Sequence, residues 1–329
     1  MSEMKGSRHI RVSNRKLSYE FTIWRNLTII RGNSATGKTT LIGMIREYNL
    51  QGEDSGVQVT CSSPCVVVEG QSWEKQLKEL DEDSIVFIDE GNRFVSSQRF
   101  AEVVRTSGSY FVIVTRENLY SLPYSVTEIY GIHSAGKYNS MQRVYHEFFR
   151  IYGEKNSFDL GKVTEIITED SNSGYQFFRA ICGRNVSCRS AAGNSNVLGA
   201  VEKSGGSEVL VIADGAAFGP YMGHVDTYQR RHHNIHLFLP ESFEWLILKS
   251  DLVGGNEVKE ILSHPEDFIE SKLYFSWEQF FTACLQRITK GTFLQYQKSS
   301  LNSVYLHSRE AEAILKTLPE QVRALLNNV

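Results

Sequence analysis

The fold of the first half of this chain is decided by Ile29-Ile30-Arg31-Gly32-Asn33-Ser34-Ala35-Thr36-Gly37-Lys38-Thr39-Thr40. An apolar strand end runs into the pattern G-x-x-x-x-G-K-T, and the apolar residues that follow begin a helix. Strand, glycine-rich loop and helix in this order are the context that a phosphate-binding P-loop requires. Gly32 and Gly37 permit the tight turn in which backbone N–H groups converge on phosphate oxygens, and the helix N-terminus adds partial positive charge.

Residues of this loop have distinct expected roles in binding a nucleoside triphosphate. Lys38 is expected to reach the β- and γ-phosphates, and the Thr39 hydroxyl to coordinate Mg²⁺. We therefore expect ATP as the ligand and Mg²⁺ as its metal ion. The expected nucleotide-binding set is Gly32, Asn33, Ser34, Ala35, Thr36, Gly37, Lys38, Thr39 and Thr40.

A second apolar run, residues 84–88, ends in Asp89 and Glu90, as is typical of a buried parallel strand with a functional tip. Acidic residues at that end of a strand lie at the crevice where ligands bind in α/β sheets. Asp89 is expected to hold Mg²⁺ through water and Glu90 to polarise the attacking water, which predicts hydrolysis. Arg116 follows another buried strand, residues 110–115, and is either a sensor of the γ-phosphate or part of a solvated helix start.

Length and composition set bounds on the class of protein. The chain has 329 residues, 41% of them hydrophobic and 22% charged, which suits a globular protein of about two domains. We expect no membrane association, because no apolar run reaches the ~18 residues of a span and residues 1–5 do not begin a signal peptide. Five scattered cysteines predict reduced thiols and a cytoplasmic location, and the x₃ spacing of Cys61 and Cys65, with no second pair, argues against zinc.

The order of apolar runs predicts an α/β fold in two parts. A hairpin, residues 9–21, precedes the P-loop, and strands then alternate with helices to residue 132, which predicts a parallel sheet with both faces covered. Residues 135–159 are polar and aromatic with no clear period, and alternation restarts at residue 163. We expect a P-loop NTPase domain at 1–155, a smaller α/β domain at 156–254 and a helical C-terminal extension at 255–329.

Carboxylates follow three strands of the predicted second domain. Glu169 and Asp214 each follow an apolar strand, and Glu241 and Glu244 follow a third. Because the carboxyl ends of parallel strands meet at one edge, Glu169 and Asp214 are expected to share a divalent cation that activates water against a phosphodiester. The spacing equally allows a helix cap at Glu169 and a turn at Asp214-Gly215.

The pattern of the second domain resembles a TOPRIM domain over residues 160–250. The resemblance rests on Glu169-Asp170-Ser171-Asn172-Ser173-Gly174, the strand ending at Asp214, and the segment Pro240-Glu241-Ser242-Phe243-Glu244-Trp245-Leu246. It implies acid–base or metal chemistry for Glu169 and Mg²⁺ or Mn²⁺ binding by an Asp-x-Asp pair, of which Asp214 matches the first position. Ala216 stands where the second Asp is expected, which either weakens Mg²⁺ binding or implies a substitute ligand such as Glu241 or Glu244.

The pairing of a P-loop half with such a domain is similar to the OLD family of ATPase/nuclease proteins. The resemblance implies a nucleotide-controlled nuclease that acts on DNA or RNA, in defence against phage or other mobile DNA. It also implies self-association, as a homo-oligomer or with a partner ATPase subunit. A basic groove of the second domain that includes Arg230 and Arg231 would contact phosphates, and Lys290, Tyr296 and Lys298 would extend it. A solvated loop explains Arg230 and Arg231 as well.

Two other functions remain open from the sequence. With Ala216 in place of an Asp, the second domain can be a catalytically degenerate module that binds a partner protein or nucleic acid under ATP control without cleaving it. The chain can also be a P-loop kinase of a small molecule, although Asp89-Glu90 favours hydrolysis.

Overall fold

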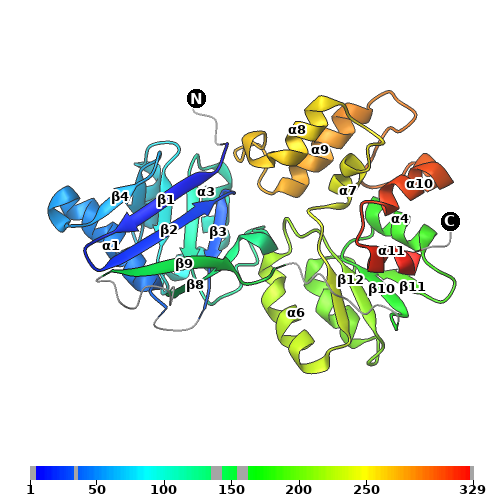
Figure 1. Cartoon of the computed structure of the whole chain (residues 1–329), viewed down its shortest axis with the longest axis horizontal. Coiled ribbons are helices and arrows are strands. Elements are labelled where there is room, and N and C mark those ends of the chain that lie inside the picture. Colours follow the sequence, from blue (N-terminus) through cyan, green and yellow to red (C-terminus); the bar gives the residue numbers. More distant parts are fainter. Residues whose placement is uncertain (1–4, 33–35, 135–142, 154–161, 327–329) are drawn as a thin grey trace. The chain divides into compact units, whose positions relative to one another are not determined.

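The computed structural model describes residues 5–32, 36–134, 143–153 and 162–326. The chain forms two compact units (Figure 1). Unit 1 contains residues 1–153 and 266–275, and unit 2 contains residues 154–265 and 276–329. The expected C-terminal extension at 255–329 is therefore divided between the units instead of forming a part of its own. Among the described residues, no helix combines the length and apolarity needed to cross a bilayer.

The described part of unit 1 is built on a nine-stranded mixed sheet in the order β4-β1-β2-β9-β8-β3-β7-β6-β5. Its strands are β1 (Arg8–Ser13), β2 (Leu17–Ile23), β3 (Leu27–Ile30), β4 (Gln58–Thr60), β5 (Cys65–Val67), β6 (Ile85–Ile88), β7 (Tyr110–Val114), β8 (Ile129–Ser134) and β9 (Val144–Arg150).

The sequence predicts a hairpin followed by a parallel sheet, and the structure joins both into one mixed sheet. Strands β8, β3, β7, β6 and β5 run parallel, whereas β1 pairs antiparallel with β2 and β4, and β8 pairs antiparallel with β9. The strand β9 lies in the region that carries no clear sequence period. All its residues are half-buried or exposed, so the strand shows no apolar alternation to read.

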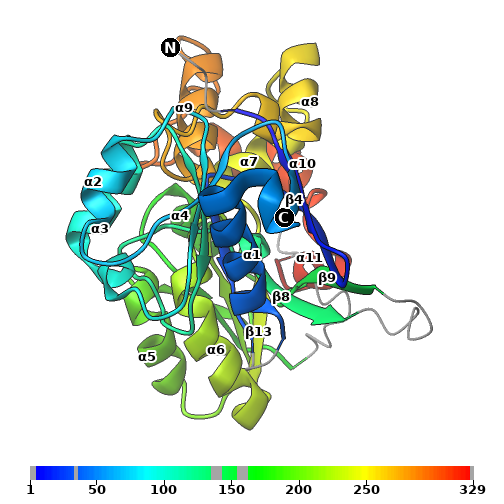
Figure 2. The ribbon, with the colours of Figure 1, turned by 90° about the vertical axis from the view of Figure 1, so that its left-hand side faces the viewer.

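Helices cover both faces of the parallel part of this sheet. Strand side chains alternate between faces. Tyr110, Val112 and Val114 of β7 join the core under α1 (Lys38–Gln51), whereas Phe111 meets Phe100 of α3 (Gln98–Thr106) edge to face. The short α2 (Trp73–Lys78) lies beside α3, to which Glu74 and Arg99 tie it by an ion pair (Figure 2).

Unit 2 has a four-stranded sheet in which all neighbours run parallel, in the order β11-β10-β12-β13. The strands are β10 (Glu165–Thr168), β11 (Ser187–Ser190), β12 (Val209–Ile212) and β13 (Ile235–Phe238). The helices are α4 (Ser173–Ile181), α5 (Val197–Glu202), α6 (Gly219–His232), α7 (Phe243–Lys249), α8 (Asn256–Ser263), α9 (Trp277–Thr289), α10 (Ser308–Leu315) and α11 (Glu320–Leu326).

These elements confirm the strand–helix alternation expected after residue 163. The apolar stretch 311–326 is divided into α10 and α11, because Pro319 lacks the N–H that a continuous helix needs. Aromatic packing joins α4 to α7, since Phe243 lies 5.2 Å from Phe177 and 5.9 Å from Phe178 between ring centroids. The packing fixes the start of α7, where Glu244 is located, against α4.

Candidate functional site

The glycine-rich segment that the sequence predicts to be a P-loop follows the carboxyl end of β3, an interior strand of the unit 1 sheet. Gly37 precedes α1 with φ +92°, a left-handed conformation in which a side chain would be strained. The helix begins at Lys38, so its first N–H groups lie next to the loop. Asn33, Ser34 and Ala35 of the expected binding set are outside the described residues.

Lys38 is oriented back toward the loop that precedes it. Its ammonium donates to the Gly32 carbonyl and to the Thr36 hydroxyl, each at 3.0 Å, and the residue is only 6% exposed. Burial lowers the pKa of Lys38, and the nearby carboxylate of Glu90 acts in the opposite direction. Thr39 and Thr40 are exposed at the first turn of α1. The lysine is thus an incompletely solvated cation beside a loop suited to anions.

The two carboxylates that follow β6 come to the same edge. Strands β3, β7 and β6 are neighbours and parallel, so their carboxyl ends lie in a row. The charges of Glu90 and Asp89 act to raise the pKa of Lys38, against the larger effect of burial. The Asp89 carboxylate accepts the backbone N–H of Glu90 at 2.8 Å and thereby fixes the turn after β6.

Arg116, at the tip of β7, forms an ion pair with Glu90 at 2.8 Å. Its side chain is 56% exposed, and its charge also acts on Lys38. Arg31 directly follows β3 and connects this strand to the loop after β7, since its guanidinium donates to the Glu117 carbonyl and the Asn118 amide oxygen, each at 2.9 Å.

Two residues that the sequence did not indicate, Tyr19 and His146, lie next to Gly37. The Tyr19 hydroxyl donates to the Gly37 carbonyl at 3.0 Å, and the Tyr19 ring stacks on His146 at 4.4 Å between centroids. A Cβ on Gly37 would lie 2.8 Å from the Tyr19 oxygen. Tyr19 and His146 come from β2 and β9, strands whose parallel pairing is not visible in the sequence.

In unit 2, the structure brings Glu169 and Asp214 together. They follow the neighbouring strands β10 and β12, and a Glu169 carboxylate oxygen accepts the backbone N–H of Asp214 at 3.0 Å. Asp214 also begins a turn, because its carbonyl accepts from Ala217 and Phe218. The turn and the convergence of carboxylates, which the sequence presented as alternatives, are both present.

Glu244 completes the carboxylate group from the first turn of α7. It is 1% exposed, and one of its oxygens accepts the Tyr296 hydroxyl at 2.7 Å. Its other oxygen is buried and has no hydrogen-bond partner among the described residues. Tyr296 is itself buried and also hydrogen-bonds the hydroxyl of Ser173. A buried carboxylate oxygen of this kind is costly unless a cation satisfies it.

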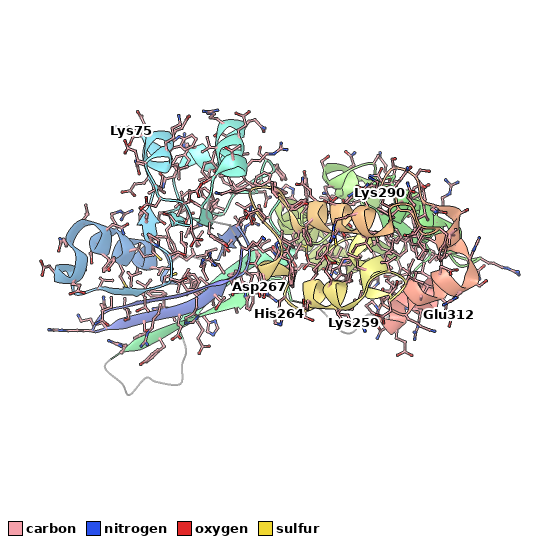
Figure 3. The ribbon with its side chains drawn as sticks, turned by 90° about the horizontal axis from the view of Figure 1, so that it is seen from above. Lys75, Lys259, His264, Asp267, Lys290 and Glu312 are labelled. Atoms are coloured by element: carbon pink, nitrogen blue, oxygen red, sulfur yellow. The ribbon has the colours of Figure 1, made fainter. Side chains whose placement is uncertain are left out.

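Lys298 places its positive charge next to these carboxylates. Its ammonium forms an ion pair with Glu278 of α9 and lies 3.9 Å from Glu244. The sequence suggested Lys298, Tyr296 and Lys290 only as members of a basic groove. Lys290 is exposed directly after α9 (Figure 3), whereas Tyr296 and Lys298 lie among the carboxylates. No local spacing signals this, since Lys298 is remote in sequence from Glu244.

Burial and mutual repulsion shift the pKa values of the carboxylates. Burial is the largest cause that raises the pKa of Glu169 to about 8, and Glu278 and Asp170 add to it. Burial, followed by the charge of Glu169, raises the pKa of Asp214 far above its usual range. For Lys298, burial opposes ionisation, but the carboxylates of Glu244, Glu278 and Asp214 raise its pKa overall. This cluster contains more carboxylates than the positive charge of Lys298 can neutralise.

The carboxylates of unit 2 are a donor set that suits a hard divalent cation. Glu169, Asp214, Glu244 and Lys298 line one small hollow that is partly open to solvent. Carboxylate oxygens are the ligands that Mg²⁺ prefers, and the orphaned oxygen of Glu244 fits such an ion. Oxygens of Glu169, Asp214 and Glu244 do not all lie within 4.8 Å of one another, so the three must draw closer to share one cation. Ala216 is buried and offers no ligand.

The basic residues at the end of α6 are not part of this hollow. Arg230 and Arg231 are at the C-terminal end of the helix, and Arg230 pairs with Asp226 at 2.9 Å while remaining exposed. Neither side chain lines the hollow.

No protein-family model and no curated protein matches the sequence of the chain. The function is therefore argued from the two sites alone.

Proposed function

We propose that unit 1 binds and hydrolyses ATP. The observation that carries the proposal is the convergence of Lys38, Asp89 and Glu90 beside a glycine-rich loop and a helix N-terminus. Backbone N–H groups and Lys38 would bind the phosphates, and Thr39 and Asp89 would hold the Mg²⁺ that travels with the nucleotide. Glu90 would orient the attacking water once the phosphates draw Arg116 away from it.

An ATPase assay with three variants tests this proposal. Lys38→Ala should abolish nucleotide binding, and Glu90→Gln should retain binding but reduce turnover by a factor of ~10² or more. Lys75→Ala is the matched control, because Lys75 is exposed on α2 in the same unit (Figure 3). Equal activity of wild type and Lys38→Ala, or no binding of ATP with Mg²⁺ by calorimetry, would refute the proposal. Release of phosphate without an acceptor separates hydrolysis from the kinase alternative.

We further propose that unit 2 processes a nucleic-acid phosphodiester with a bound divalent cation, under control of the nucleotide state of unit 1. Glu169, Asp214 and Glu244 would hold Mg²⁺ or Mn²⁺, which supplies Lewis-acid activation of water when bound. Lys298 would stabilise negative charge on the phosphate. The chain passes between the units three times, at 153/154, 265/266 and 275/276. A conformational change on nucleotide binding in unit 1 would reach unit 2 through these connections.

Cleavage assays test the second site separately from the first. Plasmid DNA and RNA are incubated with Mg²⁺ or Mn²⁺, with and without ATP, using wild type, Asp214→Asn and Glu244→Gln. Both variants should lose cleavage, whereas Glu202→Gln, an exposed carboxylate on α5, should retain it. Cleavage that is unaffected by Asp214→Asn would refute the assignment of the site.

A catalytically degenerate unit 2 is the second candidate. Ala216, the internal cation Lys298 and the separation of the three carboxylates all favour it. In that case unit 2 binds a partner protein or nucleic acid without cutting it. Calorimetric titration with Mn²⁺ distinguishes the two: binding that is lost in Asp214→Asn supports the metal-dependent enzyme, and absence of binding supports the degenerate module.

A further inference from the structure

The hollow of unit 2 contains a positive charge of its own. Among the described residues that line it, the acidic ones are Glu169, Asp170, Asp214 and Glu244, and the basic one is Lys298. The Lys298 ammonium forms an ion pair with Glu278 of α9 and lies 3.9 Å from an oxygen of Glu244. The lysine is therefore shared between one carboxylate that lines the hollow and one that does not.

The backbone of Lys298 is fixed on α4, so its ammonium reaches the carboxylates from a defined position. The Lys298 carbonyl accepts the backbone N–H of Ser173, the first residue of this helix, at 2.9 Å. Gln176 of the same helix donates its amide to the Ser299 carbonyl at 3.1 Å and accepts the backbone N–H of Leu301 at 2.8 Å. The side chain of Lys298 remains 28% exposed, so its end can move while its backbone is held.

The two oxygens of Glu244 differ in what satisfies them. One accepts the Tyr296 hydroxyl at 2.7 Å and is also the oxygen nearer to Lys298. The other is buried and has no hydrogen-bond partner among the described residues. At 3.9 Å the Lys298 ammonium is too distant for a hydrogen bond, so its charge offsets Glu244 without satisfying the second oxygen. A position for a further cation therefore remains at Glu244, next to the cation that the chain supplies.

We propose that Lys298 is a tethered counter-ion that competes with a divalent cation for the carboxylates of unit 2 and thereby sets the affinity of the site for the metal. This inference rests on the metal site proposed for unit 2. Without the metal, Lys298 neutralises part of the charge of Glu244 and Glu278. With the metal bound, repulsion between the two positive charges moves the ammonium away from Glu244, and Lys298 keeps its ion pair with Glu278.

Two substitutions should change metal affinity in opposite directions. Lys298→Met removes the competing charge and keeps a side chain of similar length, so it should tighten binding. Glu278→Gln removes the carboxylate that draws the ammonium away from Glu244, so it should weaken binding. A simple loss of negative charge at Glu278 would weaken binding whether or not Lys298 is present. The double variant separates these explanations, because Glu278→Gln should have little effect once residue 298 is uncharged.

Calorimetric titration of the full chain with Mg²⁺ at pH 9, without nucleotide, tests the proposal. Lys298→Met should bind Mg²⁺ at least tenfold more tightly than wild type, and Glu278→Gln at least threefold more weakly. The double variant should bind within twofold of Lys298→Met. Lys298→Arg keeps the positive charge and should bind as weakly as wild type. Lys290→Met is the matched control, because Lys290 is exposed just after α9 (Figure 3), and it should also behave as wild type.

The outcomes separate this inference from the metal site on which it rests. Equal affinities of wild type and Lys298→Met would overturn the inference and leave the metal site in place. Binding by Lys298→Met but not by wild type would support the inference and refute metal-dependent catalysis by the wild-type chain. Binding by neither would overturn both.

Circular dichroism covers the case in which Lys298→Met fails to fold. Folding of this variant only in the presence of Mg²⁺ would support the exchange of one cation for the other. A variant that stays unfolded at every Mg²⁺ concentration would overturn it, because the metal should then take over the neutralising role of Lys298.

Discussion

Replacement of Glu169 by glutamine should make unit 2 more stable at alkaline pH. Burial raises the pKa of Glu169 from 4.5 to about 8, so the folded state favours the protonated carboxyl. Its stabilising contribution is therefore complete below pH 4.5 and is lost as the pH rises through about 8. Glutamine resembles the protonated acid and cannot ionise, so Glu169→Gln removes this loss.

The size of the effect follows from the two pKa values. A change from 4.5 to about 8 corresponds to about 5 kcal/mol, at ~1.4 kcal/mol for each pH unit. Asp214 titrates together with Glu169, and the repulsion between them raises the pKa of both. The single substitution Glu169→Gln should therefore recover about half of this free energy. We expect the stability of wild type relative to Glu169→Gln to fall by ~2–3 kcal/mol between pH 5 and pH 9.

Urea unfolding followed by tryptophan fluorescence measures this difference. In a background with Trp24→Phe and Trp73→Phe, the remaining Trp245 and Trp277 both report on unit 2. Exposed Glu202→Gln is the control and should follow the wild-type profile. Addition of Mg²⁺ at pH 9 should restabilise wild type more than the glutamine variant. Parallel pH profiles for wild type and Glu169→Gln would refute the reasoning.

Further substitutions test the supports of the two sites. Gly37→Ala should lower ATP affinity at least tenfold, because the new Cβ would lie 2.8 Å from the Tyr19 oxygen and the residue has a φ of +92°. The control Gly43→Ala lies in open space on α1 and should stabilise this helix by ~0.5–1 kcal/mol. Nucleotide titration and thermal melting check this pair, and equal affinities would contradict the role of Gly37. Tyr296→Phe should destabilise unit 2 by ~1–3 kcal/mol, because Glu244 loses the hydroxyl at 2.7 Å and keeps a buried charge. An unchanged urea midpoint would show that this hydrogen bond contributes little to the free energy of unfolding.

Local patterns were sufficient to predict most of the elements. The antiparallel pair β1–β2, the strands β3, β6 and β7, and the alternation of unit 2 agree with their expected positions, because apolar period and turn residues specify them locally. Convergence of Glu169 with Asp214 was also expected, since parallel neighbours end at one edge. Strand β9 was missed, because its half-exposed residues carry no apolar period and its pairing with β2 joins residues remote in sequence.

The sequence by itself determined the chemistry that each segment carries: a glycine-rich loop with Lys38, a strand ending in Asp89, and strands ending in Glu169 and Asp214. Only the tertiary structure decided which other groups surround them. Packing brings Tyr19 and His146 beneath Gly37, and Lys298 and Tyr296 against Glu244, from segments far apart in the chain. The physical reason is that periodicity records which face of an element is buried, whereas the partner on that face is selected by strand order and by burial of charge across the whole domain.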